Sequence, residues 1–86
     1  MASQRRQPPV ATEFGSRVRR RRQELGWSLE RLGELSGLHW TYIGSVERGR
    51  RNPGLVNVVR LAEALRVDPG DLLRGLTLEA GSQDAH

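Results

Sequence analysis

Apolar side chains recur at helical spacing along most of the chain, in short blocks that glycine, serine or proline interrupts. In the first block Phe14, Val18 and Leu25 fall on one face of a helix, which predicts a helix over residues 13–25. Gly26 follows directly, and a glycine just beyond the last turn is a common way to end a helix.

Two more short helices are predicted on either side of a glycine. Ser28 is a suitable N-cap for a helix over about residues 29–36, and Gly37 is expected to end it in the left-handed region. The next helix is predicted over about residues 40–48. The side chains expected to face the core from this pair are Leu32, Leu35, Ile43 and Val46.

The second half of the chain carries two more helical signals. An apolar stripe predicts a fourth helix over about residues 55–66. The segment 68–71 (DPGD) offers a capping aspartate, a proline in the first turn and an early carboxylate, which together predict the start of a fifth helix. No strand pattern or internal repeat appears, so the predicted fold is all-α, a compact five-helix bundle.

The predicted helices place one domain over residues 13–76. Residues 1–12 contain Pro8-Pro9 and little apolar material, which predicts a flexible N-terminal arm. Residues 77–86 have no periodicity, which predicts a disordered tail.

Composition narrows the possible classes of protein. The chain has 86 residues, no cysteine and two histidines, so disulfides and metal sites are not expected to brace it. It has no apolar run that would span a membrane, and its first residues lack the apolar core of a signal peptide. We therefore expect a cytoplasmic protein without a membrane partner.

The charge is distributed unevenly along the chain. The formal net charge is +4, and residues 17–51 carry nine arginines against four glutamates, whereas the part after residue 51 is net acidic. A basic field on one part of a small domain suits a polyanionic partner. The alternative is that the arginines form a solvated helix face.

The second and third helices carry the features of a helix-turn-helix unit at about residues 29–48. Such a unit needs a small residue in its first helix, a glycine at the turn and apolar residues inside its second helix. Gly33, Gly37, Ile43 and Val46 supply these in order. Because glycine is costly inside a helix, Gly33 predicts that another helix approaches closely there.

The segments GWSLERLGELSGLHWTYIGSVERGRRNPGL and RLAEALRVDPGDLL make the chain resemble the lambda-repressor-like, or XRE-type, helix-turn-helix regulators. The likeness covers about residues 13–76 and implies a five-helix bundle that binds operator DNA, usually as a dimer. The shorter phrase TYIGSVERGRRNP is also similar to the controller proteins of restriction–modification systems.

In such a unit the start of the second helix meets base edges in the major groove. The predicted base-reading residues are His39, Trp40, Thr41, Gly44 and Ser45. Two of these residues have an alternative role. His39 occupies the N-cap, and its alternative role is only to cap the helix. The alternative for Trp40 is a lid over the turn, packed on Leu38.

The predicted phosphate-binding residues are Tyr42, Arg48, Arg50, Arg51 and Asn52, which lie in the third helix or directly after it. Many relatives have a polar residue at the first position of the second helix, where this chain has Leu29, so that phosphate contact is not expected here. Arg5 and Arg6 in the arm are candidates for a minor-groove contact.

The resemblance also implies a structural ion pair, which by position joins Arg22 to Glu47. It further implies pairing of two chains through the region of the last helix. The predicted dimer-interface residues are Leu72, Leu73 and Leu76, and the alternative is that these leucines complete the bundle.

The function predicted from these features is sequence-specific binding of double-stranded DNA by a transcriptional regulator, as a homodimer on two half-sites and associated with the nucleoid when bound. An enzyme is not expected, because no catalytic motif occurs, and neither a cofactor nor a small-molecule ligand is implied. The alternative is a helix-turn-helix domain used as a protein–protein interaction module, anchored by Trp40 and Tyr42.

Overall fold

The computed structural model describes residues 7–79, and this part of the chain folds into five α-helices without a strand. The helices are α1 (Pro9–Glu24), α2 (Leu29–Ser36), α3 (Trp40–Glu47), α4 (Gly54–Ala64) and α5 (Pro69–Leu73). The all-α, five-helix prediction is confirmed.

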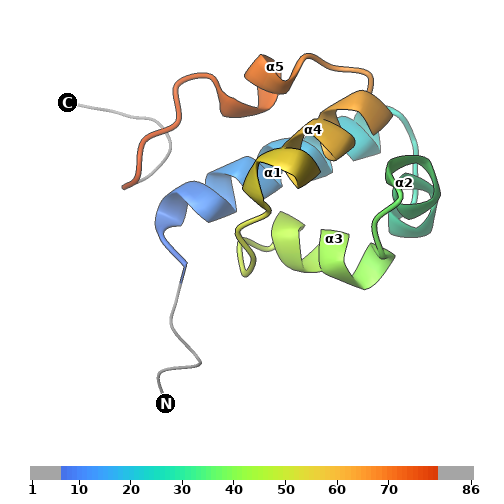
Figure 1. The fold of residues 1–86 in the computed structure, drawn as a ribbon, viewed down its shortest axis with the longest axis horizontal. Coiled ribbons are helices and arrows are strands. Elements are labelled where there is room, and N and C mark those ends of the chain that lie inside the picture. The colour runs from blue at the N-terminus through green and yellow to red at the C-terminus, as the bar shows by residue number, and fades with distance from the viewer. Residues whose placement is uncertain (1–6, 80–86) are drawn as a thin grey trace.

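The helices surround one core, with α1 and α4 at its centre (Figure 1). α1 lies behind α4 and contacts α3 and α5, while α4 contacts α2 and α5. α3 lies along one edge of the molecule with its first residues beside the end of α2, so that the start of α3 is free of the two central helices (Figure 1). The short loops that join the helices leave α2 and α3 packed on each other.

Side-chain caps begin three of the helices where the sequence predicts a helix start. The Ser28 hydroxyl accepts a hydrogen bond from the backbone N–H of Arg31, and the Asp68 carboxylate accepts one from Gly70. The His39 ring does the same for α3. Each cap satisfies a backbone donor that the first turn of a helix leaves unpaired.

The start of the first helix differs from its prediction. The residues up to 12 were expected to be an arm, but α1 begins at Pro9. Proline suits the first turn of a helix, because its missing N–H has no intrahelical acceptor there, so Pro8-Pro9 marks a helix start instead of an arm. α4 also ends at Ala64, two residues before its predicted end.

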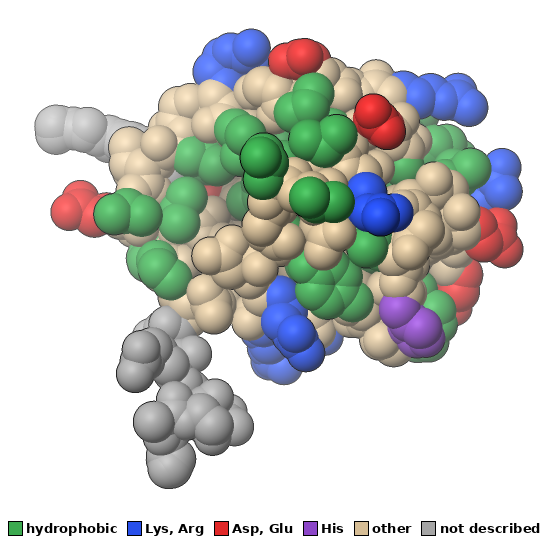
Figure 2. All heavy atoms as spheres, viewed as in Figure 1, with side chains coloured by type: hydrophobic (Ala, Val, Ile, Leu, Met, Phe, Trp, Pro, Cys, Tyr) green, Lys and Arg blue, Asp and Glu red, His purple; other side chains and the backbone are tan. Residues whose placement is uncertain are grey.

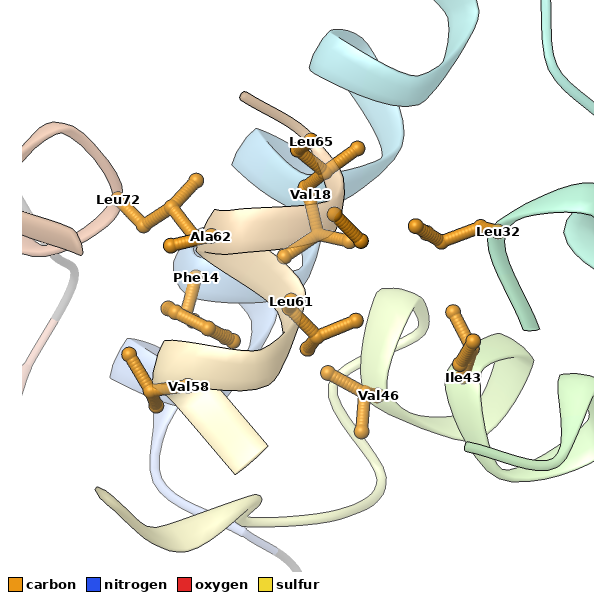
Figure 3. Packing of buried hydrophobic residues seen from close by; sticks show 11 residues of the cluster. Phe14, Val18, Leu32, Ile43, Val46, Val58, Leu61, Ala62, Leu65 and Leu72 are labelled. Atoms are coloured by element: carbon orange, nitrogen blue, oxygen red, sulfur yellow. The ribbon is translucent and has the colours of Figure 1, made fainter. Parts of the chain in front are cut away.

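The core contains apolar side chains from all five helices, which point toward one another in Figure 3. Leu32, Ile43, Val46, Leu61 and Leu65 have no exposed surface. Leu72 also belongs to this cluster and is 3% exposed, so it lies in the core and not on the surface predicted for dimerisation. The leucines of the last helix therefore divide between core and surface.

α1 and α3 approach each other closely at Gly15, which is buried. A side chain at this position would collide with the backbone carbonyl oxygens of Val46 and Glu47. Glycine is thus required where the two helices meet, and this contact fixes the position of α3 against the core.

Within residues 7–79 no helix is long and apolar enough to cross a membrane. The same part of the chain contains no group of three or more histidine, aspartate or glutamate side chains suited to hold a metal ion.

Candidate nucleic-acid interface

The turn between α2 and α3 is tight, and two glycines make it possible. Gly37 has φ 78°, in the left-handed region that glycine adopts without strain. A Cβ atom on Gly33 would lie 2.9 Å from the carbonyl oxygen of Leu38 and 3.4 Å from the backbone nitrogen of Trp40. The nearest atom at Gly33 thus belongs to the turn and not to the predicted neighbouring helix, whose first residue comes next. The Ser36 hydroxyl accepts a hydrogen bond from the N–H of Leu38 at 3.2 Å. These contacts set the angle at which α3 leaves the turn.

α3 has an inward side and an exposed first turn. Ile43 and Val46 are fully buried, and they hold the helix on the core. Trp40, Thr41 and the capping residue His39 are exposed, and Trp40 keeps 44% of its surface accessible. The first turn thus presents two rings and a hydroxyl to the outside.

His39 caps α3 and also contacts its neighbours in the first turn. Its Nδ1 atom accepts a hydrogen bond from the backbone N–H of Thr41 at 3.1 Å and lies 2.7 Å from the Thr41 hydroxyl oxygen. The His39 and Trp40 rings are stacked, with centroids 5.9 Å apart. Trp40 is therefore an exposed side chain stacked against His39.

The remaining predicted base-reading residues are less accessible. Gly44 is buried, and a Cβ atom there would lie 3.3 Å from Nη1 of Arg48 and 3.5 Å from Cδ1 of Leu29. Its predicted outward position therefore differs from the structure, because Leu29 of α2 and the Arg48 side chain cover this part of α3. Ser45 is half-buried, and its carbonyl oxygen accepts a hydrogen bond from the Arg50 N–H at 2.9 Å.

Tyr42 joins α3 to α4 and to the loop after α3. Its half-buried hydroxyl accepts a hydrogen bond from the Asn57 amide at 3.1 Å, and the Arg51 guanidinium carbon lies 5.8 Å from the centre of its ring. Sequence reasoning missed Asn57. The available signal was a polar residue with low helix propensity inside the predicted fourth helix, one turn before Leu61.

The predicted phosphate-binding residues other than Tyr42 are exposed and lie next to one another. They are Arg48, Arg50, Arg51 and Asn52. Within residues 7–79 none of their side chains forms a hydrogen bond or an ion pair. In Figure 2 basic side chains gather at the edge of the molecule where this loop follows α3. This basic loop (residues 48–52) directly adjoins the helix whose first turn is exposed.

Several arginines of α1, by contrast, bind to their own chain. Arg17 donates to the carbonyl oxygen of Arg74 at 2.6 Å, and Arg21 donates to that of Leu65 at 2.9 Å. These side chains close the gap between α1 and the end of the bundle. Much of the positive charge on α1 is thereby engaged in holding the fold.

The ion pair between α1 and α3 joins Arg22 to Glu47 through two hydrogen bonds of 2.7 and 2.9 Å. The side chains are only 12% and 5% exposed. Arg22 also donates to the Trp27 carbonyl oxygen at 2.8 Å. The hydrogen bonds that Arg22 donates to the Glu47 carboxylate raise the pKa of Arg22 above its ordinary value, so the guanidinium stays charged. Because the pair is bidentate and buried, it fixes the rotation of α3.

A separate apolar groove of about 330 Å³ lies between the start of α1, the start of α4 and the segment after α5. Leu55, Leu73 and Leu78, which line it, are exposed, and Leu76 is half-buried. Figure 2 shows hydrophobic side chains over this side of α4 and α5. Arg5 and Arg6, the candidates for a minor-groove contact, lie outside the described residues.

The chain is similar to known proteins over nearly the whole of this fold. A helix-turn-helix family model matches residues 18–72. Control protein C.BamHI of Bacillus amyloliquefaciens is 42% identical over 66 residues, which cover 76% of this chain and 82% of that protein.

Two solved structures share the arrangement of the helices. The restriction-modification controller protein C.AhdI from Aeromonas hydrophila matches with a TM-score of 0.71 and 48% identity over 72% of this chain and 94% of that one. The P22 c2 repressor in complex with a synthetic operator matches with a TM-score of 0.67 and 34% identity, again over 72% of this chain and 94% of that one.

Proposed function

Since this chain belongs to the helix-turn-helix family of DNA-binding transcriptional regulators, of the XRE or lambda-repressor-like type, we propose that it recognises a specific double-stranded operator through α3. The observation that carries the proposal is the exposed first turn of α3 together with the unpaired basic loop at the other end of the same helix. A helix can enter the major groove only if its reading side chains are free and its flanks tolerate phosphate.

Base reading is assigned to the exposed residues His39, Trp40 and Thr41, with Ser45 at the margin. Thr41 offers a hydroxyl and a methyl group, and Trp40 offers an apolar face and one N–H. Gly44 takes an indirect part in this arrangement. Without a side chain at that position, Leu29 and Arg48 lie close to the α3 backbone.

Phosphate binding is assigned to the basic loop and to Tyr42. The exposed guanidinium groups of Arg48, Arg50 and Arg51 have no competing carboxylate among the described residues. The Tyr42 hydroxyl accepts from Asn57, which leaves its own proton available to a phosphate oxygen. These contacts would fix the register of α3 in the groove without reading sequence.

The active unit is proposed to be a homodimer that pairs through the apolar groove. Leu73 and Leu76, predicted for this role, lie at the groove, while the buried Leu72 leaves the set. Leu55 and Leu78 take its place, because they are 77% and 74% exposed in the single chain. Burial of such side chains between two copies removes apolar surface from water and stabilises the pair.

A salt titration tests DNA binding directly. The affinity of the wild-type protein for one duplex should fall steeply with salt, because each neutralised phosphate releases counterions. The double variant Arg50→Ala/Arg51→Ala should bind all sequences more weakly and reduce the slope of log affinity against log salt by roughly 2. The matched control Arg60→Ala/Arg74→Ala removes two exposed arginines elsewhere and should leave the slope unchanged.

The same titration separates DNA binding from use of the domain as a protein-interaction module. A flat dependence of affinity on salt, with equal slopes for the wild type and both double variants, would contradict DNA binding. Affinity for a protein partner that depends on Trp40 and ignores salt would support the interaction module.

A further inference from the structure

The contact between His39 and Thr41 fixes which of their atoms carry hydrogen. A backbone N–H can only donate, so the 3.1 Å hydrogen bond from the Thr41 N–H requires a lone pair on Nδ1 of His39. In the neutral ring the proton then lies on Nε2. This tautomer is supported by the fold itself, because the Thr41 N–H is one of the donors that the first turn of α3 leaves unpaired.

The same lone pair determines the direction of the second contact. The Thr41 hydroxyl oxygen lies 2.7 Å from Nδ1, and because Nδ1 has no proton, the hydroxyl must donate. Its single proton is thus directed at His39. Toward the outside, the hydroxyl oxygen is left with lone pairs only.

We propose that His39 and Thr41 present a fixed pair of opposite hydrogen-bonding groups to DNA, with Thr41 Oγ1 as an acceptor and His39 Nε2–H as a donor. The proposal rests on the proposed function and names the chemistry that it recognises. In the major groove, the donors available to Thr41 are the exocyclic amino groups of adenine N6 and cytosine N4. The His39 N–H requires an acceptor, on a base edge or a phosphate oxygen.

The position of the two residues supports this role. Both are exposed and lie at the N-terminus of α3, the end of such a helix that meets base edges. Stacking on Trp40 holds the imidazole ring, with an interplanar angle of 24°, so that the direction of its outer N–H is restricted. Threonine alone would discriminate poorly, because a free hydroxyl both donates and accepts. The bond to His39 removes that ambiguity.

The first test observes the tautomer without DNA. In the neutral ring, long-range proton–nitrogen NMR correlations distinguish a protonated Nε2 from a protonated Nδ1. The His39→Asn variant assigns the signal, because His86 is the other histidine. We expect the proton on Nε2, and a proton on Nδ1 would overturn the proposal whatever the protein binds.

The second test uses Thr41 variants and selection of duplexes from random sequence. Thr41→Ser keeps the hydroxyl and should keep a preference for adenine or cytosine at one position, whereas Thr41→Val keeps the methyl group and should relax it by roughly five- to tenfold. A duplex that contains an analogue of that base without its amino group should bind the wild type and Thr41→Ser more weakly, by the same factor. The affinity of Thr41→Val for this duplex should change little. A preference for guanine or thymine that depends on the hydroxyl, or a preference unchanged in Thr41→Val, would overturn the proposal.

The third arm concerns His39. Asparagine is a good N-cap, so His39→Asn should keep α3 while it removes the imidazole N–H. If His39→Asn relaxes the preference at a further base pair, the acceptor of the His39 N–H is a base. If the variant binds all sequences more weakly by the same factor, the acceptor is a phosphate oxygen. No change in either would overturn the His39 part. Failure of the wild type to bind any duplex would contradict the proposed function, whereas the NMR result would still decide the tautomer.

Discussion

At the scale of single residues, the arginines of this chain differ by what their guanidinium groups touch. Arg17, Arg21 and Arg22 bind carbonyl or carboxylate oxygens of their own chain, which stabilises the packing of α1. Arg48 and Arg50 have no such oxygen among the described residues and lie directly after α3. Unpaired positive charge is therefore available to a partner at the end of the proposed reading helix.

Removal of one partner of the Arg22–Glu47 pair should strongly destabilise the fold. Glu47→Ala leaves a nearly buried guanidinium without its carboxylate and should lower the free energy of unfolding by about 3 kcal/mol. Urea denaturation measures this free energy of unfolding. The control is Glu34→Ala, which removes the exposed pair with Arg31 and should cost roughly 0.5 kcal/mol or less. Equal, small losses in both variants would mean that the Glu47 pair is solvated.

Much of this detail was not predictable from the residues alone. The pairing of Arg22 with Glu47 came from a resemblance, and the carbonyl partners of Arg17 and Arg21 are distant in sequence, so no local pattern indicates them. The burial of Gly44 depends on where Leu29 of another helix lies. Helical periodicity gives the face of a residue, whereas its neighbours follow from tertiary packing.

At the scale of the elements, local chemistry determines the helix ends and one glycine determines how two helices meet. The caps at Ser28 and Asp68 are local signals, so they were predictable from sequence. The α1 start was predicted late, because a proline pair suits both an extended arm and a first helical turn. At Gly15 the local signal is only a glycine inside the first predicted helix, and nothing local indicates that α3 is the helix that approaches there.

Gly15→Ala should separate α1 from α3 and thereby disturb the proposed DNA interface. The new methyl group would collide with backbone oxygen atoms of Val46 and Glu47, which cannot rotate away. We expect a lower melting temperature together with weaker duplex binding. Gly44→Ala is the matched control: its nearest obstacle is the flexible end of Arg48, and alanine favours the helix by up to about 1 kcal/mol, so its stability should be retained. If the melting temperature of Gly15→Ala equalled that of the wild type, the close contact of α1 with α3 at Gly15 would be contradicted.

At the scale of the whole molecule, the bundle has two different surfaces. The start of α3 and the basic loop form a polar and basic one, and the groove beside α5 forms an apolar one. In a two-fold symmetric pair the apolar surface would hold the copies together, while two α3 helices reach half-sites about 34 Å apart on one face of the duplex.

Replacement of Leu73 by glutamate should dissociate the proposed dimer. Leu73 is 42% exposed at the groove, so the change leaves the core intact while it places a charge in the interface. Analytical ultracentrifugation should give a monomer mass, and footprinting should show weaker protection of both half-sites. Leu35→Glu is the control. Leu35 was predicted to face the core, but it is 40% exposed on α2, away from the groove. A wild-type complex with one protein chain on a single half-site would contradict the dimer.

The central claim is that the exposed first turn of α3 reads DNA sequence. Selection of bound duplexes from random sequence, followed by sequencing, tests it most directly when the wild type is compared with Trp40→Ala and Thr41→Ala. Each selection uses the same concentration of folded protein, so that a loss of stability in a variant does not count as a loss of binding. We predict one enriched site for the wild type and a changed preference at different base pairs in each variant, with salt-dependent binding to other sequences retained. Recovery of the same site by all three proteins would contradict the assignment of α3 as the reading helix.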